Sequence, residues 1–398
     1  MKGQLYLGDN LEVLRRRVPN ESVDLVYLDP PFNSGTDYVI AFRERGGGEP
    51  GGQTFAFGDT WRWGDESEKA LGEALERHEK LGKFLELLVG SLGKGSFSAY
   101  LVTMAVRLIE LHRVLRPTGS LYPHCDPTAS HYLKTILDQI FGPGNFRNEI
   151  AWKRTSAHSS AKRWGPVHDV ILFYTKGEEY TWNTLHQAYG EGYLEREYRF
   201  QDGRGRYAPA DLTGAGEREG DSGRPWRSIP PTKGRHWALP KREKLPPWVN
   251  PPENWEGMTA QEKLDFLDAT GLIHWPKKGK MPYLKRYLET REAIPVQDVI
   301  LDIPPLSPTS KERLGYPTQK PLVLIERIVQ VSSNPGDTVL DPFCGAGTTL
   351  VAAQRLGRGW IGIDESPLAI ALTQGRLERD FGLEPGRDYV MEGAPRSL

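Results

Sequence analysis

Residues 338–350, TVLDPFCGAGTTL, decide the fold, because they join a predicted strand to a predicted helix through a turn that contains two glycines. Glycines at such a turn let the backbone approach a ligand closely and leave N–H groups of the helix free. Nineteen residues after Gly345, the next predicted strand ends in Asp364, at the spacing that lets a carboxylate accept hydrogen bonds from a ribose. Leu350 stands where a dinucleotide site has its third glycine, so the pattern favours a nucleoside without phosphates. The alternative is a tight glycine turn followed by a surface aspartate.

Strands and helices alternate over most of the chain. Residues 23–28, VDLVYL, are almost all β-favouring, as in a strand buried on both faces of a parallel sheet. Apolar residues repeat with a period of about 3.6 over 100–115, which predicts a helix. We therefore predict an α/β fold with an open, mostly parallel sheet. Its strands are expected at 4–7, 23–28, 120–123, 169–174, 338–341 and 359–364, and its helices at 65–90, 100–115, 128–141, 321–333 and 348–356.

The composition excludes several classes of protein. Of the 398 residues, 51 are Lys or Arg and 52 are Asp or Glu, so the chain as a whole is not a polycation. Two cysteines exclude a disulfide scaffold and a four-cysteine zinc site, and no metal is expected. No apolar run has the length of a signal peptide or a membrane span, so we expect a cytoplasmic protein.

Prolines and tryptophans gather in one region of the chain. Ten prolines lie between 225 and 282, and six of the eleven tryptophans lie between 182 and 275. We expect a separate, irregular lobe at 176–300, between two halves of one sheet at 1–175 and 301–398. The glycine-rich residues 46–52 predict a mobile loop over 42–65, within an inserted loop and helical segment at 42–95.

Asp29-Pro30-Pro31-Phe32 follows the strand predicted at 23–28. The two prolines stiffen the loop, which presents the Asp29 carboxylate and the Pro30 carbonyl as neighbouring acceptors. The exocyclic amine of a base has two N–H donors to match them. Two acceptors would aim the nitrogen lone pair at an electrophile and stabilise the positive charge that develops on nitrogen, while Phe32 could stack on an extruded base. The alternative is a rigid turn at the end of a strand.

Basic residues cluster with aromatic residues in and beside the irregular lobe. Residues 152–164 contain four basic residues and no acidic one, between Trp152 and Trp164. Phosphate neutralisation beside aromatic side chains is typical of nucleic-acid contact. The alternative is solvated charge on a lobe whose tryptophans form its core. The candidate contacts are Lys153, Arg154, Arg224, Arg227, Lys233, Arg235, Lys277 and Lys278.

Together, Asp29-Pro30-Pro31-Phe32 and the later turn Asp341-Pro342-Phe343-Cys344-Gly345-Ala346-Gly347 resemble motifs of the amino-methylating DNA methyltransferases that use S-adenosylmethionine. Their order, with the tetrapeptide before the glycine turn, is similar to that of the circularly permuted β group. Gly8-Asp9-Asn10 and the stretch 316–321, YPTQKP, resemble further elements of the family. The resemblance implies a Rossmann-like methyltransferase sheet, with the target-base loop in 1–175, target recognition by 176–300 and S-adenosylmethionine bound by 301–398.

The resemblance also implies a role for individual residues. Asp29 and Pro30 would hold the target amine. Asp364 would bind the ribose of the cofactor, and Asp9 would lie near its adenine amine. The implied catalytic residues are Asp29, Pro30, Pro31 and Phe32, where Tyr is more usual than Phe. The implied cofactor residues are Asp9, Asn10, Thr318, Lys320, Asp341, Phe343, Gly345, Gly347, Thr348 and Asp364, of which Asp341, Gly345, Thr318 and Lys320 would lie at the methionine end.

The sequence thus predicts a site-specific DNA methyltransferase that acts on adenine N6 in duplex DNA after base flipping. Asp29 favours adenine, because members that methylate cytosine N4 more often begin the tetrapeptide with Ser; cytosine N4 stays open. From other classes, a nicotinamide-dependent oxidoreductase and a non-catalytic DNA-binding protein stay open. Cytosine C5 methylation needs a cysteine directly after a proline, and the chain has no such pair. The expected partner is double-stranded DNA, and a homodimer and a cognate restriction endonuclease are left open.

Overall fold

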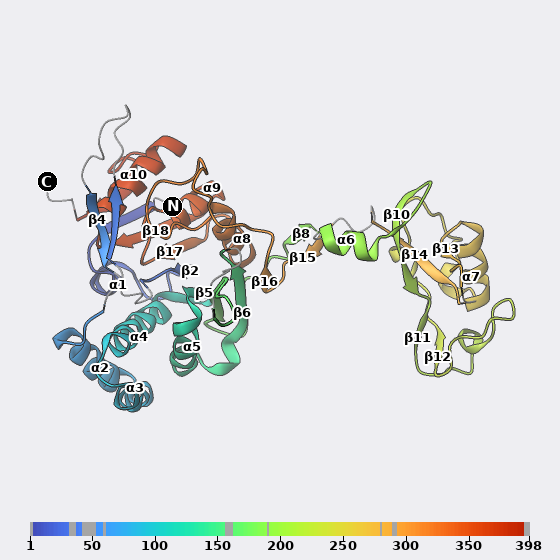
Figure 1. The fold of residues 1–398 in the computed structure, drawn as a ribbon, viewed down its shortest axis with the longest axis horizontal. Helices are drawn as coiled ribbons and strands as arrows, with labels where there is room; N and C mark the ends of the chain where they lie inside the picture. The colour runs from blue at the N-terminus through green and yellow to red at the C-terminus, as the bar shows by residue number, and fades with distance from the viewer. Residues whose placement is uncertain are drawn as a thin grey trace. The chain divides into compact units, whose positions relative to one another are not determined.

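The computed structural model describes residues 3–31, 37–41, 53–58, 61–155, 162–188, 191–278, 281–288 and 293–393. The chain divides into two compact units (Figure 1). Unit 1 comprises Met1–Leu185 and Gln297–Leu398, and unit 2 comprises His186–Val296. Unit 2 lies inside the stretch 176–300 that the sequence separates as a lobe. In the described part of the chain, no helix combines the length and the apolar character needed to cross a membrane.

Unit 1 is built on one large sheet. Within the described residues it has nine strands in the order β16-β6-β7-β5-β2-β17-β18-β1-β19. Neighbouring strands run parallel except where β7 pairs with β5 and β6. This confirms the predicted α/β class with a mostly parallel sheet. The strands are β1 (Gly3–Leu7), β2 (Val23–Leu28), β5 (Leu115–Cys125), β6 (Phe146–Lys153), β7 (His168–Thr175), β16 (Val299–Ile300), β17 (Thr338–Asp341), β18 (Gly359–Asp364) and β19 (Tyr389–Glu392).

Helices cover both faces of this sheet. Successive side chains of a strand point to opposite faces, so Val26 and Leu28 of β2 belong to one apolar cluster and Leu25 and Tyr27 to another. The first cluster includes side chains of α1 (Asn10–Arg17), α2 (Asp65–Arg77), α3 (Glu79–Leu92), α4 (Ser96–Val114) and α5 (Pro127–Phe141). The second includes side chains of α8 (Leu322–Ser332), α9 (Thr348–Arg355) and α10 (Pro367–Phe381).

Within unit 1, three of the differences between predicted and observed elements bear on the sequence signals. The helix predicted over 65–90 is two helices, α2 and α3, that meet at His78. The mobile loop predicted over 42–65 is wrong at Gln53–Gly58, which forms β4 and pairs with β3 (Asp37–Ala41); 42–52 and 59–60 lie outside the described residues. The sequence QTFAFG has aromatic residues at alternating positions, which is typical of a strand. The glycines before it nevertheless led to the prediction of a loop. Strand β6 was not predicted, because its side chains are half exposed and form no apolar run.

Unit 2 has its own core. A sheet of the order β13-β14-β10-β9 packs against a cluster that includes the buried side chains of Trp226, Trp237 and Trp255. Three tryptophans of this stretch therefore serve packing in unit 2, whereas Trp248 and Trp275 are exposed. Its elements are β8 (His186–Ala188), α6 (Glu191–Glu197), β9 (Phe200–Asp202), β10 (Gly205–Asp211), β11 (Thr213–Ala215), β12 (Arg235–Trp237), α7 (Ala260–Ala269), β13 (Ile273–His274), β14 (Tyr283–Tyr287) and β15 (Ala293–Pro295).

Candidate active site

A pocket of about 830 Å³ opens along the carboxyl edge of the sheet in unit 1. Ligands of open α/β sheets bind at this edge, and ligand pockets commonly measure roughly 300–1,000 Å³. Each of seven neighbouring strands contributes a polar residue to the pocket wall. In the order of the strands β6, β7, β5, β2, β17, β18 and β1, these residues are Arg154, Asp169, Asp126, Asp29, Asp341, Asp364 and Asp9.

Most of the site residues predicted for unit 1 line this pocket. They are Asp9, Asn10, Asp29, Pro30, Pro31, Arg154, Thr318, Lys320, Asp341, Phe343, Gly345, Thr348 and Asp364. Gly347 lies in the same turn and is the N-cap of α9. Lys153 is exposed and ends β6 directly before Arg154. Phe32 lies outside the described residues.

The glycine turn holds two carboxylates, of which Asp341 is buried and Asp364 is half-buried. Asp364 accepts hydrogen bonds from the N–H groups of Gly345, at 2.8 Å, and Ser366, at 2.9 Å. Asp341 accepts from the N–H of Phe343 at 3.0 Å and from the hydroxyl of Thr349 at 2.6 Å. Burial raises the pKa of Asp341 to about 7 and that of Asp364 to about 6. The turn is therefore formed and internally hydrogen-bonded before any ligand binds.

Glycine is required at both predicted positions of this turn. Gly345 and Gly347 have φ values of +49° and +73°, in the left-handed region. A Cβ atom on Gly345 would lie 3.1 Å from the ring of Tyr316, and one on Gly347 would lie 2.7 Å from Thr373. The absence of a side chain at Gly345 therefore lets the ring of Tyr316 pack directly against the turn.

Asp9 and Asn10 are fixed by an arginine that the sequence did not single out. Arg107 of α4 forms an ion pair with Asp9 at 2.7 Å and donates to Oδ1 of Asn10 at 2.6 Å. Asn10 in turn donates to the carbonyl of Pro342 at 2.8 Å, so this end of the pocket is tied to the glycine turn. The helical periodicity of residues 100–115 placed Arg107 on α4 but gave no sign of its partners.

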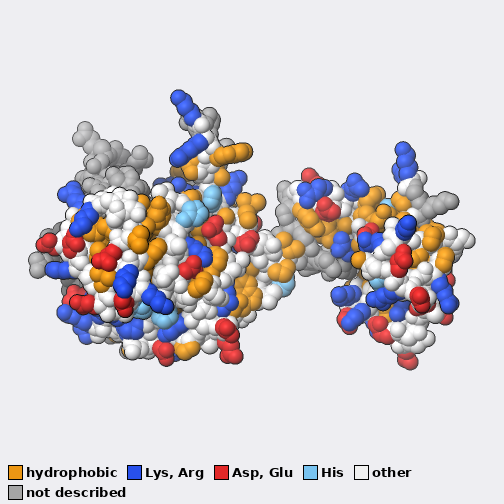
Figure 2. All heavy atoms as spheres, turned by 90° about the horizontal axis from the view of Figure 1, so that it is seen from below, with side chains coloured by type: hydrophobic (Ala, Val, Ile, Leu, Met, Phe, Trp, Pro, Cys, Tyr) orange, Lys and Arg blue, Asp and Glu red, His pale blue; other side chains and the backbone are white. Residues whose placement is uncertain are grey.

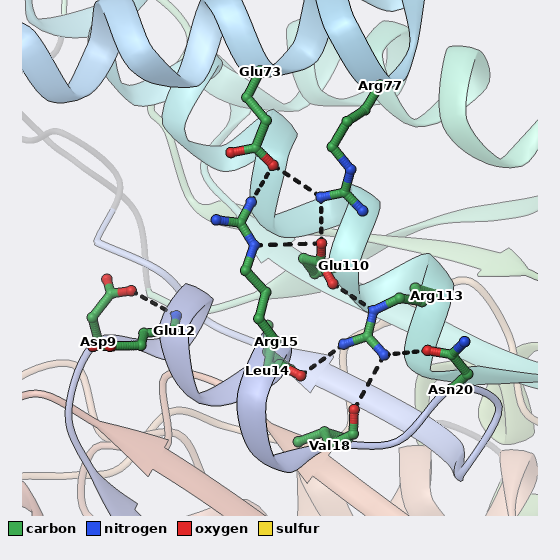
Figure 3. A network of polar contacts seen from close by, with 10 residues as sticks. All are labelled: Asp9, Glu12, Leu14, Arg15, Val18, Asn20, Glu73, Arg77, Glu110 and Arg113. Carbon is green, nitrogen blue, oxygen red and sulfur yellow. Dashed lines mark hydrogen bonds and ion pairs between the residues drawn. The ribbon is translucent and has the colours of Figure 1, made fainter.

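A network of charges joins α1 to the helices that cover it (Figure 3). Glu110 of α4, with a side chain 2% exposed, contacts Arg15, Arg77 and Arg113. Arg113 also donates to the carbonyls of Leu14, at 2.7 Å, and Val18, at 3.2 Å. Arg107 and Glu110 lie about one helical turn apart on α4. The same helix therefore packs on this network and places Arg107 at the pocket.

Asp29, directly after β2, has one oxygen bound and one open. Lys320 donates to Oδ2 of Asp29 and, at 3.1 Å, to the carbonyl of Thr318. Oδ1 of Asp29 is buried and, among the described residues, has no hydrogen-bond partner. An acceptor left open inside a pocket favours a ligand that brings a donor, because a buried unpaired acceptor is costly. The methionine-end role predicted for Lys320 stays a prediction.

A second set of polar residues continues from Tyr27 toward Arg154. The hydroxyl of Tyr27 and Nδ1 of His124 share a hydrogen bond of 2.8 Å, and Nε2 of His124 lies 3.1 Å from Oδ2 of Asp169. Nε of Arg154 forms an ion pair with Oδ1 of Asp169 at 2.9 Å. Of these residues, only Arg154 was a predicted site residue. His124 and Asp169 are fully or nearly fully buried.

Neither cysteine has the character of a nucleophile. Cys125 and Cys344 are free and buried, and burial raises the pKa of each thiol well above its usual value. Both therefore have the character of ordinary buried thiols. Among the described residues, no group of three or more His, Cys, Asp and Glu side chains is arranged to hold a metal ion.

The basic residues predicted for unit 2 differ in their surroundings. Arg227 pairs with Asp265, at 2.8 Å, and with Asp268, at 2.5 Å. Arg235 donates to the Thr213 carbonyl at 2.6 Å. On the face shown in Figure 2, basic and acidic side chains are interspersed over both units. Arg224, Lys233, Lys277 and Lys278 are exposed, and their predicted contact with DNA stays a prediction.

The family model for N6/N4 DNA methylases matches residues 23–374. The Type II methyltransferase M.EcaI of Enterobacter cloacae is 32% identical over 387 residues, which make up 97% of this chain and 71% of that protein. The Mod subunit of the Type III restriction-modification enzyme StyLTI of Salmonella typhimurium is 25% identical over 88% of this chain, which spans about half (49%) of that subunit. The solved complex of M1.HpyAVI with S-adenosylmethionine is 16% identical, with a TM-score of 0.40, and the match covers 94% of this chain and 98% of that one. Because the family model matches most of this chain, the chain belongs to the N6/N4 DNA methylases.

Proposed function

We propose that this DNA methyltransferase transfers a methyl group from S-adenosylmethionine to N6 of an adenine flipped out of duplex DNA. The observation that carries the proposal is the open Oδ1 of Asp29, in a pocket that also contains Pro30 and the glycine turn. Asp rather than Ser at the head of the tetrapeptide favours adenine over cytosine N4. A pyrophosphate-binding turn is disfavoured, because Leu350 is fully buried and packs against Gly362.

The residues of the glycine turn fit the nucleoside and methionine parts of S-adenosylmethionine. The cofactor supplies a methyl group on a sulfonium, which is already a good leaving group. Asp364 presents a carboxylate for ribose hydroxyls, and its two backbone hydrogen bonds hold that carboxylate in place. Asp9, held by Arg107, presents a second carboxylate at the far end of the pocket.

Asp29 and Pro30 act on the target amine. The amine nitrogen of adenine is a weak nucleophile, because its lone pair is delocalised into the ring. Oδ1 of Asp29 and the Pro30 carbonyl accept its two N–H bonds, which favours a pyramidal nitrogen and stabilises the positive charge that builds up during transfer. Asp29 or water can receive the proton that the product must lose. Positioning and charge stabilisation are thus the main contributions of the protein.

The experiment that tests this proposal is methylation of genomic DNA that lacks modified bases. The purified protein and S-adenosylmethionine are incubated with the DNA, the nucleosides are identified by mass spectrometry, and the modified positions are mapped by single-molecule sequencing. N6-methyladenine within one short sequence is the expected product. N4-methylcytosine as the product would refute the choice of base while keeping the family assignment.

The partners follow from the proposed substrate. Double-stranded DNA is the substrate, and the named relatives belong to Type II and Type III restriction-modification systems, so a cognate restriction endonuclease that cleaves the same unmodified sequence fits this proposal. A cytoplasmic location, in contact with the DNA of the nucleoid, goes with it. A homodimer stays a prediction from the family resemblance.

A further inference from the structure

The pocket wall beyond Asp29 carries polar residues for which the proposed function gives no role. In the sheet order β6-β7-β5-β2, the carboxyl end of β6 and the start of β7 lie at the same edge as Asp29, because β7 alone runs antiparallel. Arg154 and Asp169 line the pocket at this edge. They therefore belong to the end of the pocket where the target base enters, away from the glycine turn.

The position of Arg154 is set by the pairing of these two strands. Trp152 pairs with Asp169 in the register of β6 and β7, and the N–H of Arg154 donates to the carbonyl of Val167 at 3.0 Å. The Arg154 side chain is 48% exposed, whereas that of Asp169 is 4% exposed. Since Nε is the nitrogen that contacts Asp169, the two terminal nitrogens lie at the outer end of a side chain that lines the pocket.

Asp169 forms an ion pair with Arg154 through Oδ1, which makes no hydrogen bond among the described residues. Its Oδ2 is bound by His124, which is fully buried and is held on its other side by the hydroxyl of Tyr27. Burial and the positive charge of Lys320 lower the pKa of His124, so its imidazole is neutral and bridges the two groups. Burial alone would raise the pKa of Asp169, but the hydrogen bond from His124 and the nearby positive charges give a net lowering. Asp169 thus stays ionised beside Arg154.

The chemistry of a flipped aminobase calls for a donor at this wall. Its exocyclic amine has two N–H bonds, and the acceptors Asp29 and Pro30 match both. The ring atoms beside the amine are acceptors, N1 and N7 in adenine and N3 in cytosine. Flipped bases are read by hydrogen bonds to such edges, and a guanidinium is a donor that is always charged.

We propose that Arg154 binds a ring nitrogen beside the exocyclic amine of the flipped base, and that Asp169 is the positioning residue that orients its guanidinium. This inference rests on the proposed function and goes beyond it, because it replaces a general phosphate contact with a specific contact to the base. The base is then held on both sides of the reacting nitrogen, by acceptors at Asp29 and Pro30 and by a donor at Arg154.

The test removes one acceptor atom at a time from the target base. Duplexes of the mapped recognition sequence carry adenine, 1-deazaadenine or 7-deazaadenine at the target position, and kcat/KM is measured for the wild type and Arg154→Ala. We expect the variant to lose roughly tenfold to a hundredfold on adenine, the range of one good base contact. On the analogue that lacks the contacted nitrogen, wild type and variant should differ by less than about threefold, because neither can form the hydrogen bond.

The contrary outcomes are equally clear. Equal losses for Arg154→Ala on all three duplexes would mean that Arg154 acts on the DNA backbone or on the fold, and would overturn the inference. Full activity of the variant would overturn it as well. If Arg154 contacted a phosphate, DNA binding by Arg154→Ala would depend less steeply on salt than binding by the wild type. Arg154→Lys, which keeps the charge but not the planar fork, would then recover activity. Arg379→Ala is the matched control, because Arg379 is an exposed arginine of α10 that pairs with Asp380.

Asp169→Asn tests the positioning role separately. We expect it to weaken the discrimination between adenine and the analogue while leaving the affinity for S-adenosylmethionine unchanged, an outcome that simple loss of folding would not produce. Unchanged discrimination in a folded variant would contradict the role of Asp169. If the product is N4-methylcytosine, the choice of adenine fails, and the same comparison with 3-deazacytosine at the target position decides on Arg154 independently.

Discussion

The carboxylates at the two ends of the pocket differ in how many of their oxygens are hydrogen-bonded within the protein. At the glycine turn, both oxygens of Asp341 and both oxygens of Asp364 accept hydrogen bonds from the turn itself. At the other end, Asp29 has one oxygen bound by Lys320 and one that has no hydrogen-bond partner among the described residues. The turn is therefore preorganised to bind, whereas Asp29 keeps an acceptor open for a group that arrives later.

This difference predicts that one end of the pocket determines the affinity for S-adenosylmethionine and the other end the rate of methyl transfer. A carboxylate that contacts the cofactor away from the reacting atoms contributes about equally to the ground state and the transition state. A carboxylate that meets its donor only in the ternary complex can act mainly on the transition state. Substitutions at the two ends should therefore affect different kinetic constants.

The largest effect is expected for Asp29→Asn. An amide can accept through only one oxygen and cannot balance a developing positive charge, so we expect kcat to fall by about 10²- to 10³-fold, as when one preorganised group for a developing charge is removed. Affinity for S-adenosylmethionine, measured by calorimetry, should stay within about twofold. Glu384→Gln, which neutralises an exposed carboxylate that pairs with Arg387, is the control. Normal turnover by Asp29→Asn would contradict the catalytic assignment.

Asp364→Asn should give the opposite pattern. The neutral amide would replace the carboxylate that is proposed to accept from the ribose hydroxyls, so one hydrogen bond between the cofactor and a charged group would be lost. Such bonds contribute about 1.5–3 kcal/mol, so the Kd for S-adenosylmethionine should increase by roughly tenfold to a hundredfold. The rate of transfer at saturating cofactor should change much less. A variant that binds normally but transfers slowly would reverse the division between the two ends.

The sequence revealed the glycine-turn end of the pocket more fully than the target-base end. Asp341, Asp364 and Asp29 each follow a run of β-favouring residues, and the ends of parallel strands meet at one edge of the sheet, so their proximity could be predicted. Asp169 could not be, because β7 is antiparallel and brings its first residues, not its last, to that edge. Arg154 was predicted as a DNA contact from local charge alone, and its pairing with Asp169 depends on a half-exposed strand that the hydrophobic pattern does not show.

Unit 2 illustrates the same limit for charged residues. A stretch rich in Arg and Lys predicted a DNA-binding surface, yet Arg227 is paired with two aspartates of α7 that lie about forty positions later in the sequence. Side-chain pairs at such separations depend on tertiary packing, which spacing along the chain cannot reveal. The sequence left open whether the tryptophans of this region form its core or lie beside DNA-contacting residues, and the structure places Trp226, Trp237 and Trp255 in the core.

Two glycines with similar φ values allow the cost of a left-handed backbone to be distinguished from the cost of steric crowding at Cβ. Gly347 and Gly357 have φ values of +73° and +74°, but only at Gly347 would a Cβ atom meet a neighbour, Thr373 at 2.7 Å. Substitution by Ala should cost about 1–2 kcal/mol of folding free energy at Gly357, from the left-handed backbone alone. Gly347→Ala should cost about 1–3 kcal/mol more, because crowding adds to strain. Chemical denaturation of both variants measures the difference, and equal stabilities would show that the turn can relax around Thr373.

The smallest effect concerns pH at the preorganised end. Burial raises the pKa of Asp341 to about 7, well above its ordinary value, so the folded protein holds this proton more tightly than the unfolded chain. The contribution of Asp341 to the free energy of unfolding therefore decreases as the pH rises from about 4 to about 7.

Binding has the opposite sign, because the cationic sulfonium and ammonium groups of S-adenosylmethionine favour the ionised carboxylate. At pH 7, binding should release a fraction of a proton, detected as a dependence of the calorimetric enthalpy on the ionisation enthalpy of the buffer. Between pH 8 and pH 6 the Kd should increase by up to about tenfold, since one pKa unit corresponds to about 1.4 kcal/mol. Asp341→Asn should abolish this dependence above pH 6.5, whereas Asp29→Asn should preserve it. A Kd that does not change with pH in the wild type would show that Asp341 lies too far from the charged groups of the ligand to respond to them.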